Sequence, residues 1–160
     1  MSVIKTVSGR LLEFLRRRDK TVIDESDERS RRTLLVVDDE ESICFSMREY
    51  FSQHGFKVDT ASEMEEAEGL IKETDYKVII QDLRLGLNRH PDGIEIIKLV
   101  HKQYPETRII VLTSYGSKEV EEEARRAGAD AFLRKPKPLS QVAQVVQGLI
   151  ESPRARTVRA

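Results

Sequence analysis

The sequence has a single cysteine, Cys44, and no tryptophan among its 160 residues. One thiol cannot form an internal disulfide, and it cannot supply the clustered ligands of a structural zinc site. No apolar run approaches the roughly 18 residues that a membrane-spanning helix needs. The first residues also lack the apolar core and cleavage site of a secretory signal, because cations interrupt them. Together these absences indicate a protein of the reducing cytoplasm.

An excess of charge of one sign is also missing. The 27 Lys and Arg residues nearly balance the 28 Asp and Glu residues, which leaves a formal net charge of −1. Proteins that bind nucleic acid neutralise its phosphates with clustered positive charge. We therefore expect no direct binding to nucleic acid. The length suits one domain with flanking segments.

What the sequence does contain is an alternation of two apolar periods between residues 33 and 151. Short runs rich in β-branched residues predict strands, and segments with apolar residues at helical spacing predict helices between them. The expected strands are Leu34–Val37, Phe56–Ala61, Val78–Ile80, Arg108–Leu112 and Ala129–Leu133. The expected helices are Glu41–His54, a segment opened by Ser62, Gly93–Tyr104, Ser117–Ala127 and Leu139–Ile150. For the second helix, Ser62 and Glu65 have the spacing of a capping box.

This alternation predicts an α/β fold, a doubly wound five-stranded parallel sheet with helices on both faces. The continuous apolar run Val78–Ile80 supports it, because such a strand is buried on both sides. Right-handed crossovers favour the strand order 2-1-3-4-5, which is the flavodoxin-like arrangement. In that order a ligand crevice lies at the carboxyl ends of the first and third strands, where the direction of winding reverses.

Chemically active residues stand at these strand ends. Two acids follow the first strand, one acid the third, a hydroxyl ends the fourth and a lysine follows the fifth: Asp38, Asp39, Asp82, Thr113 and Lys135. Clustered carboxylates repel each other unless a cation is present, and oxygen ligands suit Mg²⁺. A carboxylate can act as a nucleophile and form an aspartyl phosphate. The hydroxyl and the ammonium could then bind the new phosphoryl oxygens.

Four motifs at these strand ends resemble the receiver domains of bacterial two-component response regulators, such as the chemotaxis-regulator type. They are Leu-Val-Val-Asp-Asp ending at Asp39, Ile-Ile-Gln-Asp ending at Asp82, Val-Leu-Thr-Ser ending at Ser114, and Phe-Leu-Arg-Lys-Pro ending at Pro136. The resemblance covers residues 33–151. It implies a phosphorelay protein that a histidine kinase or a phosphotransfer protein phosphorylates on Asp82. It also implies a downstream effector protein or output domain as partner.

The resemblance assigns a metal site. By analogy with the family, Asp38 and Asp39 hold Mg²⁺ together with Asp82, and the main-chain carbonyl of Arg84 completes the protein ligands.

The resemblance also assigns a switch. Thr113 moves to bind the phosphoryl group, Lys135 pairs with it, and Phe132 is the aromatic switch residue. The Lys135–Pro136 bond is cis in this family, and an X-Pro bond is the type for which cis costs little. The partner-binding surface would then comprise the helix after the fourth strand, the fifth strand and the last helix.

The segment after Asp82 departs from the family pattern. Gly86 stands where a proline is common, Gly93 is the counterpart of the family glycine, and the loop Leu85–Asp92 is longer than usual. Gln81, where an apolar residue is common, has no explanation in the sequence. The large residues Arg84 and Tyr115 flank the crevice, and we expect them to hinder the attacking water and lengthen the life of the phosphoryl group.

Three segments flank the expected domain. Residues 1–20 form an amphipathic segment that could pack on the domain, form a dimer helix, contact an anionic membrane through its arginines, or be disordered. Packing or self-association is favoured over membrane contact. Residues 21–32 are a charged linker and residues 152–160 a basic tail.

Two other functions compete with a phosphoacceptor. One is a receiver-like interaction scaffold that works without phosphorylation. The other is a Mg²⁺-dependent phosphatase with an aspartyl-phosphate intermediate, which usually needs a second acid two residues after its nucleophile. Arg84 stands at that position, so we expect that the protein is not an enzyme.

Overall fold

The computed structural model describes residues 32–86, 92–152 and 154. The amphipathic segment 1–20, almost all of the charged linker, residues 87–91 of the long loop and most of the basic tail lie outside the described residues. The described unit begins at Arg32. Within it, no helix combines the length and the apolar character needed to cross a membrane.

Five parallel strands form one sheet in the order β2-β1-β3-β4-β5, which confirms the predicted topology. The strands are β1 (Thr33–Val37), β2 (Lys57–Ala61), β3 (Val78–Gln81), β4 (Arg108–Thr113) and β5 (Ala131–Arg134). Val37 pairs with Gln81, and Gln81 pairs with Val111. The carboxyl ends of the three central strands therefore lie at one edge of the sheet.

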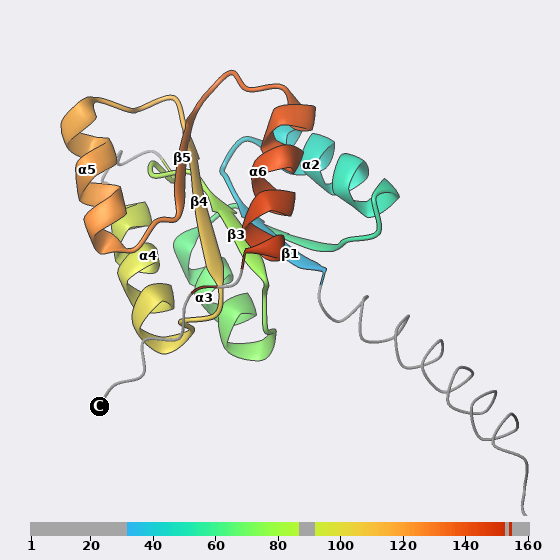
Figure 1. The fold of residues 1–160 in the computed structure, drawn as a ribbon, viewed down its shortest axis with the longest axis horizontal. Coiled ribbons are helices and arrows are strands. Elements are labelled where there is room, and N and C mark those ends of the chain that lie inside the picture. Colours follow the sequence, from blue (N-terminus) through green and yellow to red (C-terminus); the bar gives the residue numbers. More distant parts are fainter. Residues whose placement is uncertain (1–31, 87–91, 153, 155–160) are drawn as a thin grey trace, which may run out of the picture. The chain divides into compact units, whose positions relative to one another are not determined.

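Five helices cover the sheet: α2 (Glu41–Gln53), α3 (Met64–Glu73), α4 (Asp92–Gln103), α5 (Lys118–Ala127) and α6 (Leu139–Glu151). Helices α2 and α6 lie on one face, and α3, α4 and α5 lie on the other (Figure 1). Alternate strand residues feed the two cores, because successive side chains point to opposite faces. Leu35 and Ile79 pack under α3–α5, whereas Leu34 and Ile80 pack under α2 and α6.

Two helix boundaries follow local sequence signals. Gly55 has a φ of +83°, the left-handed conformation that ends α2. At the start of α5, the Ser117 hydroxyl accepts a hydrogen bond from the Val120 N–H at 3.3 Å.

The capping box predicted for the second helix is wrong. Helix α3 has Glu63 at its N-cap with no side-chain bond, and Ser62 is bonded by Glu66, not by Glu65. The Ser62 N–H donates to the Glu66 carboxylate at 2.9 Å. A capping box between Ser62 and Glu65 requires Ser62 at the N-cap. The helix begins one residue later, so Glu66 is the acid that can reach Ser62.

The opposite edge of the sheet carries a polar cluster around Asp130. Arg154 donates to both carboxylate oxygens of Asp130, at 3.1 and 2.6 Å, and to the carbonyls of Pro105 at 3.0 Å and Gly128 at 3.4 Å. Arg108 also donates to Asp130, at 2.8 Å, and to the carbonyl of Ser152. One residue of the basic tail is therefore tied to the ends of α4 and α5.

Candidate functional site

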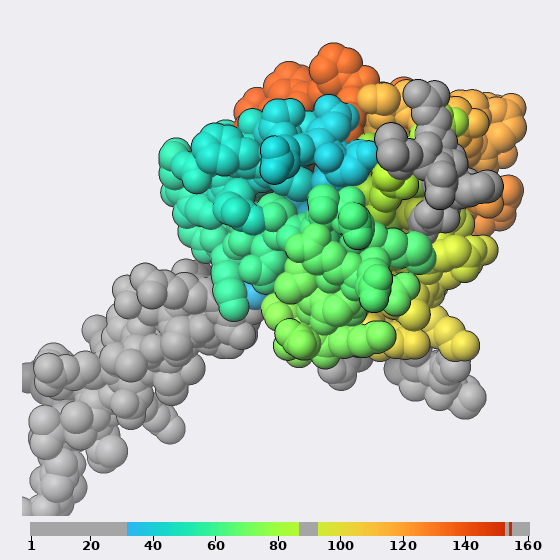
Figure 2. Space-filling view, turned by 180° about the vertical axis from the view of Figure 1, so that it is seen from behind, coloured from blue at the N-terminus to red at the C-terminus, as the bar shows by residue number. Residues whose placement is uncertain are grey.

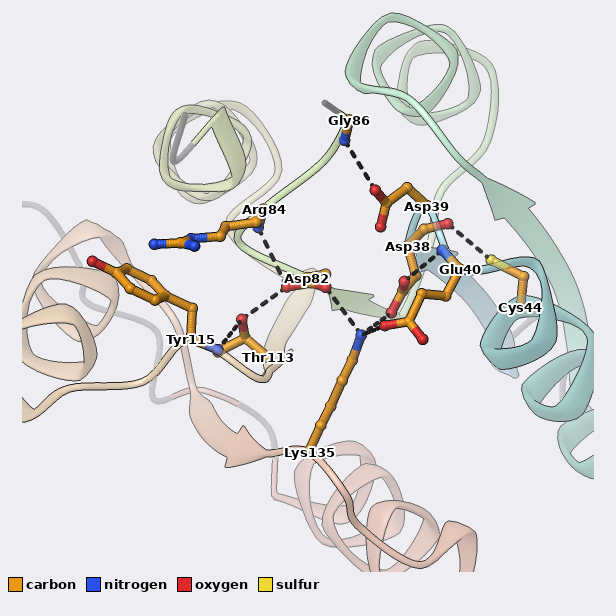
Figure 3. Close-up of polar contacts among 10 residues, drawn as sticks. All are labelled: Asp38, Asp39, Glu40, Cys44, Asp82, Arg84, Gly86, Thr113, Tyr115 and Lys135. Atoms are coloured by element: carbon orange, nitrogen blue, oxygen red, sulfur yellow. Dashed lines mark hydrogen bonds and ion pairs between the residues drawn. The ribbon is translucent and has the colours of Figure 1, made fainter. Parts of the chain in front are cut away.

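Main-chain bonds extend the sheet beyond β1 and β3 and so place two acids side by side. The Asp38 N–H donates to the Ala61 carbonyl at 3.0 Å, and the Asp82 N–H donates to the Val37 carbonyl at 2.9 Å. Both side chains are buried, as is Thr113 at the end of β4. Figure 3 shows these residues converging with Lys135, which follows β5.

Both carboxylate oxygens of Asp82 are hydrogen-bonded. Oδ1 accepts from the Thr113 hydroxyl at 2.8 Å and from the Arg84 N–H at 3.3 Å, and Oδ2 accepts from the Lys135 ammonium at 3.0 Å (Figure 3). The hydroxyl and the lysine predicted to bind a phosphoryl group thus already bind the carboxylate that would carry it.

The Lys135 ammonium joins three acids. It donates to Asp38 at 2.7 Å, Asp82 at 3.0 Å and Glu40 at 3.1 Å. Burial alone would favour the neutral amine, but hydrogen bonds and the charges of Asp38 and Asp82 outweigh it, and the pKa of Lys135 is raised. The lysine is therefore a fixed positive charge in the site.

The Asp38 carboxyl responds in the other direction. Its burial raises its pKa, and the hydrogen bonds from Lys135 and from the Glu40 N–H offset this only in part. The site thus keeps at least one acid whose charge is costly, which is a condition that a bound cation relieves.

Oxygen atoms of Asp38, Glu40 and Asp82 lie within 4.8 Å of one another and could hold a metal ion. An all-oxygen set of carboxylates fits a hard divalent cation such as Mg²⁺ or Ca²⁺. The Lys135 ammonium bonded to the same three acids shows that the cluster stabilises positive charge. Glu40 was not among the predicted ligands, because the motif that resembles the family ends at Asp39, although the acidic run after β1 was a signal for it.

The predicted ligand Asp39 lies outside this group of three. Its carboxylate accepts a hydrogen bond from the Gly86 N–H at 3.1 Å and so contacts the segment that follows Asp82 (Figure 3). Arg84 lies beside Asp82, as its N–H bond shows.

The two residues predicted to tune the phosphoryl lifetime stack on each other. The Arg84 guanidinium lies 3.3 Å from the centroid of the Tyr115 ring, a cation–π contact (Figure 3). The Tyr115 N–H donates to the Thr113 hydroxyl oxygen at 3.1 Å. The stack is therefore linked through the main chain to both groups that bond Asp82 Oδ1.

Phe132 is half-buried and packs against the core under α3–α5. A Cβ on Gly116 would lie only 3.0 Å from the Phe132 ring, so the turn after β4 passes directly over it. The Lys135–Pro136 bond is cis, as predicted.

A groove of about 700 Å³ between α2 and the start of α3 leads to Asp38. Both helices contribute to the face that Figure 2 shows, and Phe45 of α2, which is 67% exposed, lines the groove. The Cys44 thiol in its wall donates to the Asp38 carbonyl at 3.2 Å. Burial and the Asp38 charge raise the pKa of this thiol, so it is not an activated nucleophile.

Sheet order, helix layers and the acidic edge define the class of flavodoxin-like α/β domains with a cation-stabilising site at the carboxyl ends of the strands. Within this class, the family model of the response regulator receiver domain matches residues 34–147. The chain therefore belongs to the receiver domain family, whose members are signalling domains of two-component systems.

Sequence similarity to known regulatory proteins supports this family membership. The chain is 28% identical over 121 residues to the photosynthetic apparatus regulatory protein RegA of Cereibacter sphaeroides, covering 76% of this chain and 64% of RegA. It spans less than two thirds of the length of the first curated relatives it matches.

Solved structures match the fold as well. One is a Burkholderia pseudomallei response regulator with a phosphorylated aspartic acid, a calcium ion and citrate, at 29% identity and a TM-score of 0.68, covering 75% of this chain and 69% of that one. Another is the beryllofluoride-activated NtrC4 receiver domain dimer, at 32% identity and a TM-score of 0.68, covering 75% and 97%.

Proposed function

We propose that this protein receives a phosphoryl group on Asp82 from a histidine kinase or a phosphotransfer protein, and passes the change on to a partner. The observation that carries the proposal is the set of contacts to Asp82, in which the Thr113 hydroxyl and the Lys135 ammonium each bind one carboxylate oxygen. The phosphorylated aspartic acid of the similar Burkholderia pseudomallei regulator supports it.

The transfer step needs little from the protein beyond position and charge. An Asp82 oxygen attacks the phosphorus of a phosphohistidine and forms a P–O bond while the P–N bond breaks, and the departing imidazole nitrogen takes a proton from solvent. Lys135 remains an ammonium throughout, and it neutralises charge on the phosphoryl oxygens. Thr113 turns its hydroxyl from the carboxylate to one of these oxygens.

Mg²⁺ is the cation that we assign to the site, with Asp38, Asp39, Asp82 and the carbonyl of Arg84 as protein ligands. The ion would neutralise the transferring phosphoryl group. Asp38 and Asp82 lie together in the site, and Glu40 adds a third acid near them.

The phosphoryl group adds roughly −1.5 to −2 charges, and we propose that α5, β5 and α6 respond as the partner-binding surface. Thr113 and Tyr115 lead directly into α5, so a change at the Thr113 hydroxyl moves the turn before that helix. A downstream effector protein or output domain in the cytoplasm is the partner we favour. A homodimer is a second arrangement, supported by the NtrC4 receiver dimer.

The test is intact mass after incubation with a small-molecule phosphodonor and Mg²⁺. We expect the wild type to gain one phosphoryl group and Asp82→Asn to gain none. Asp75→Asn, which alters an exposed acid in the connection between α3 and β3, is the matched control and should label normally. An unlabelled wild type, or equal labelling of Asp82→Asn, would reject the proposal.

A further inference from the structure

Gln81 is a polar side chain with no exposed surface, at the end of β3 and directly before Asp82. Its Nε2 donates to the carbonyl of Gly93 in the first turn of α4, at 3.1 Å. Within the described part of the chain, no donor lies within hydrogen-bond distance of its Oε1. A buried acceptor without a donor costs free energy. Stability alone therefore does not explain a glutamine at this position.

The bond from Gln81 crosses an unusually close contact between two main chains. A Cβ on Gly93 would lie 2.7 Å from Leu83 Cα, 2.8 Å from the Asp82 carbonyl oxygen and 3.0 Å from Gln81 Nε2. The Gly93 N–H also donates to the Leu83 carbonyl, at 3.3 Å. The start of α4 thus rests on the main chain of Asp82 with no side chain between them.

This contact closes the base of the loop that borders the site. The loop leaves the sheet through Leu83 and Arg84, and the Arg84 N–H bonds the Asp82 carboxylate. It returns at α4, where Gly93 meets Gln81. A long loop has more freedom to lose than a short one, so a bond at its base restricts the main chain beside Asp82.

We propose that Gln81 is a positioning residue for the Asp82 site. Its amide holds the first turn of α4 against the end of β3, and this keeps the Arg84 main chain in place beside Asp82, where it would bind Mg²⁺. The inference rests on the proposed function, in which Asp82 accepts a phosphoryl group with Mg²⁺ bound.

The primary test is Gln81→Met, which keeps the length of the side chain but removes the amide. Gly93 keeps a donor for its carbonyl, because α-helical geometry supplies the N–H of Ile97. We expect a thermal midpoint equal to or above that of the wild type, since the unpaired Oε1 is gone. We also expect the Kd for Mg²⁺ alone, measured by titration calorimetry, to rise about threefold to tenfold, with labelling slowed about tenfold.

A second variant disturbs the same contact from the other side. Gly93→Ala should weaken Mg²⁺ binding in the same direction, but with a lower thermal midpoint because its Cβ has no room. The matched control is Gly69→Ala in α3, where a Cβ meets no atom within 4 Å, so Mg²⁺ binding should not change.

Two results for Gln81→Met would overturn the proposal. One is Mg²⁺ affinity and labelling equal to those of the wild type, and the other is a thermal midpoint several degrees lower, which would make Gln81 a structural residue. A wild type that binds Mg²⁺ but gains no phosphoryl group would instead defeat the proposed function. The Mg²⁺ titrations of the two proteins would still decide the role of Gln81.

Discussion

Asp38 gives the site a pH dependence whose sign follows from its raised pKa. The folded protein binds a proton on Asp38 more readily than the unfolded chain, whose carboxyl has the ordinary pKa of 3.8. The free energy of unfolding therefore falls as the pH rises from 3.8 through the raised pKa. Asp38→Asn removes this titration and should be the more stable protein at neutral pH without metal.

Denaturant unfolding at a series of pH values measures this effect. The stability difference between Asp38→Asn and the wild type should grow as the pH rises and then level off. It should vanish below pH 3.8, where the carboxyl is protonated in both states. If Asp38→Asn were less stable than the wild type at neutral pH, the charge of Asp38 would not be costly in the folded protein.

Arg84 and Tyr115 act as one unit, because the guanidinium lies on the ring. We expect Arg84→Ala with Tyr115→Ala to shorten the phosphoryl lifetime about tenfold, the effect of about 1.4 kcal/mol on the barrier. Either single change should give much of that effect, since each breaks the stack. The measurement is the decay of labelled protein followed by mass, with Arg48→Ala on α2 as the control. Decay at the wild-type rate in the double variant would show that the stack does not shield the acyl phosphate.

Individual residues of the site could be predicted only where the strand order fixes them. Asp82, Thr113 and Lys135 each stand at a strand end, and the sheet order alone brings those ends together. The bond of Lys135 to Glu40, the bond of Asp39 to Gly86 and the role of Gln81 depend on side-chain rotamers and loop paths. No periodicity in the sequence encodes these.

At the scale of elements, α5 is the most weakly anchored helix next to the site. Ala124 is its only fully buried side chain, whereas α6 buries Val142 and Val146. Small buried area gives little packing stabilisation, at about 25 cal/mol per Å². We expect α5 to open at a lower free-energy cost than α6, so its amide hydrogens should exchange faster. Hydrogen-exchange mass spectrometry measures this, and equal protection of the two helices would argue against α5 as the responsive element.

The end of α5 is, in contrast, tightly constrained where it meets α4. Gly128 has a φ of +124°, and a Cβ there would lie 2.4 Å from the His101 side chain. Gly128→Ala should therefore cost about 1–3 kcal/mol of stability. Gly148→Ala in α6, where a Cβ has open space, should stabilise by up to about 1 kcal/mol. Thermal unfolding compares them, and two similar midpoints would show that the α4–α5 contact yields easily.

Helices and strands could be predicted because their apolar periods are long and regular. Their ends were harder, as α3 shows. Two acids, Glu65 and Glu66, are close enough in the sequence to bond Ser62. Which of them bonds depends on where the helix begins, and tertiary packing decides that.

At the scale of the whole molecule, Arg154, the last described residue, is bound at the edge of the sheet opposite Asp82. Arg154→Ala should cost about 1 kcal/mol, because Arg108 still pairs with the Asp130 carboxylate. In a domain of this size that lowers the thermal midpoint by a few degrees. Arg126→Ala, an exposed arginine of α5, is the control and should change it little. If both variants lowered the thermal midpoint by the same amount, Arg154 would contribute only its charge.

The position of Arg154 also bears on how the protein can be handled. Arg154 is bound at the amino ends of the strands, and the acidic crevice lies at their carboxyl ends. A fluorescent reporter attached after residue 154 would therefore start far from the crevice. A boundary drawn at residue 152 would instead cut away the guanidinium that Asp130 binds. A fusion should therefore retain Arg154, and it would leave the crevice around Asp82 open to the phosphoryl donor that we propose.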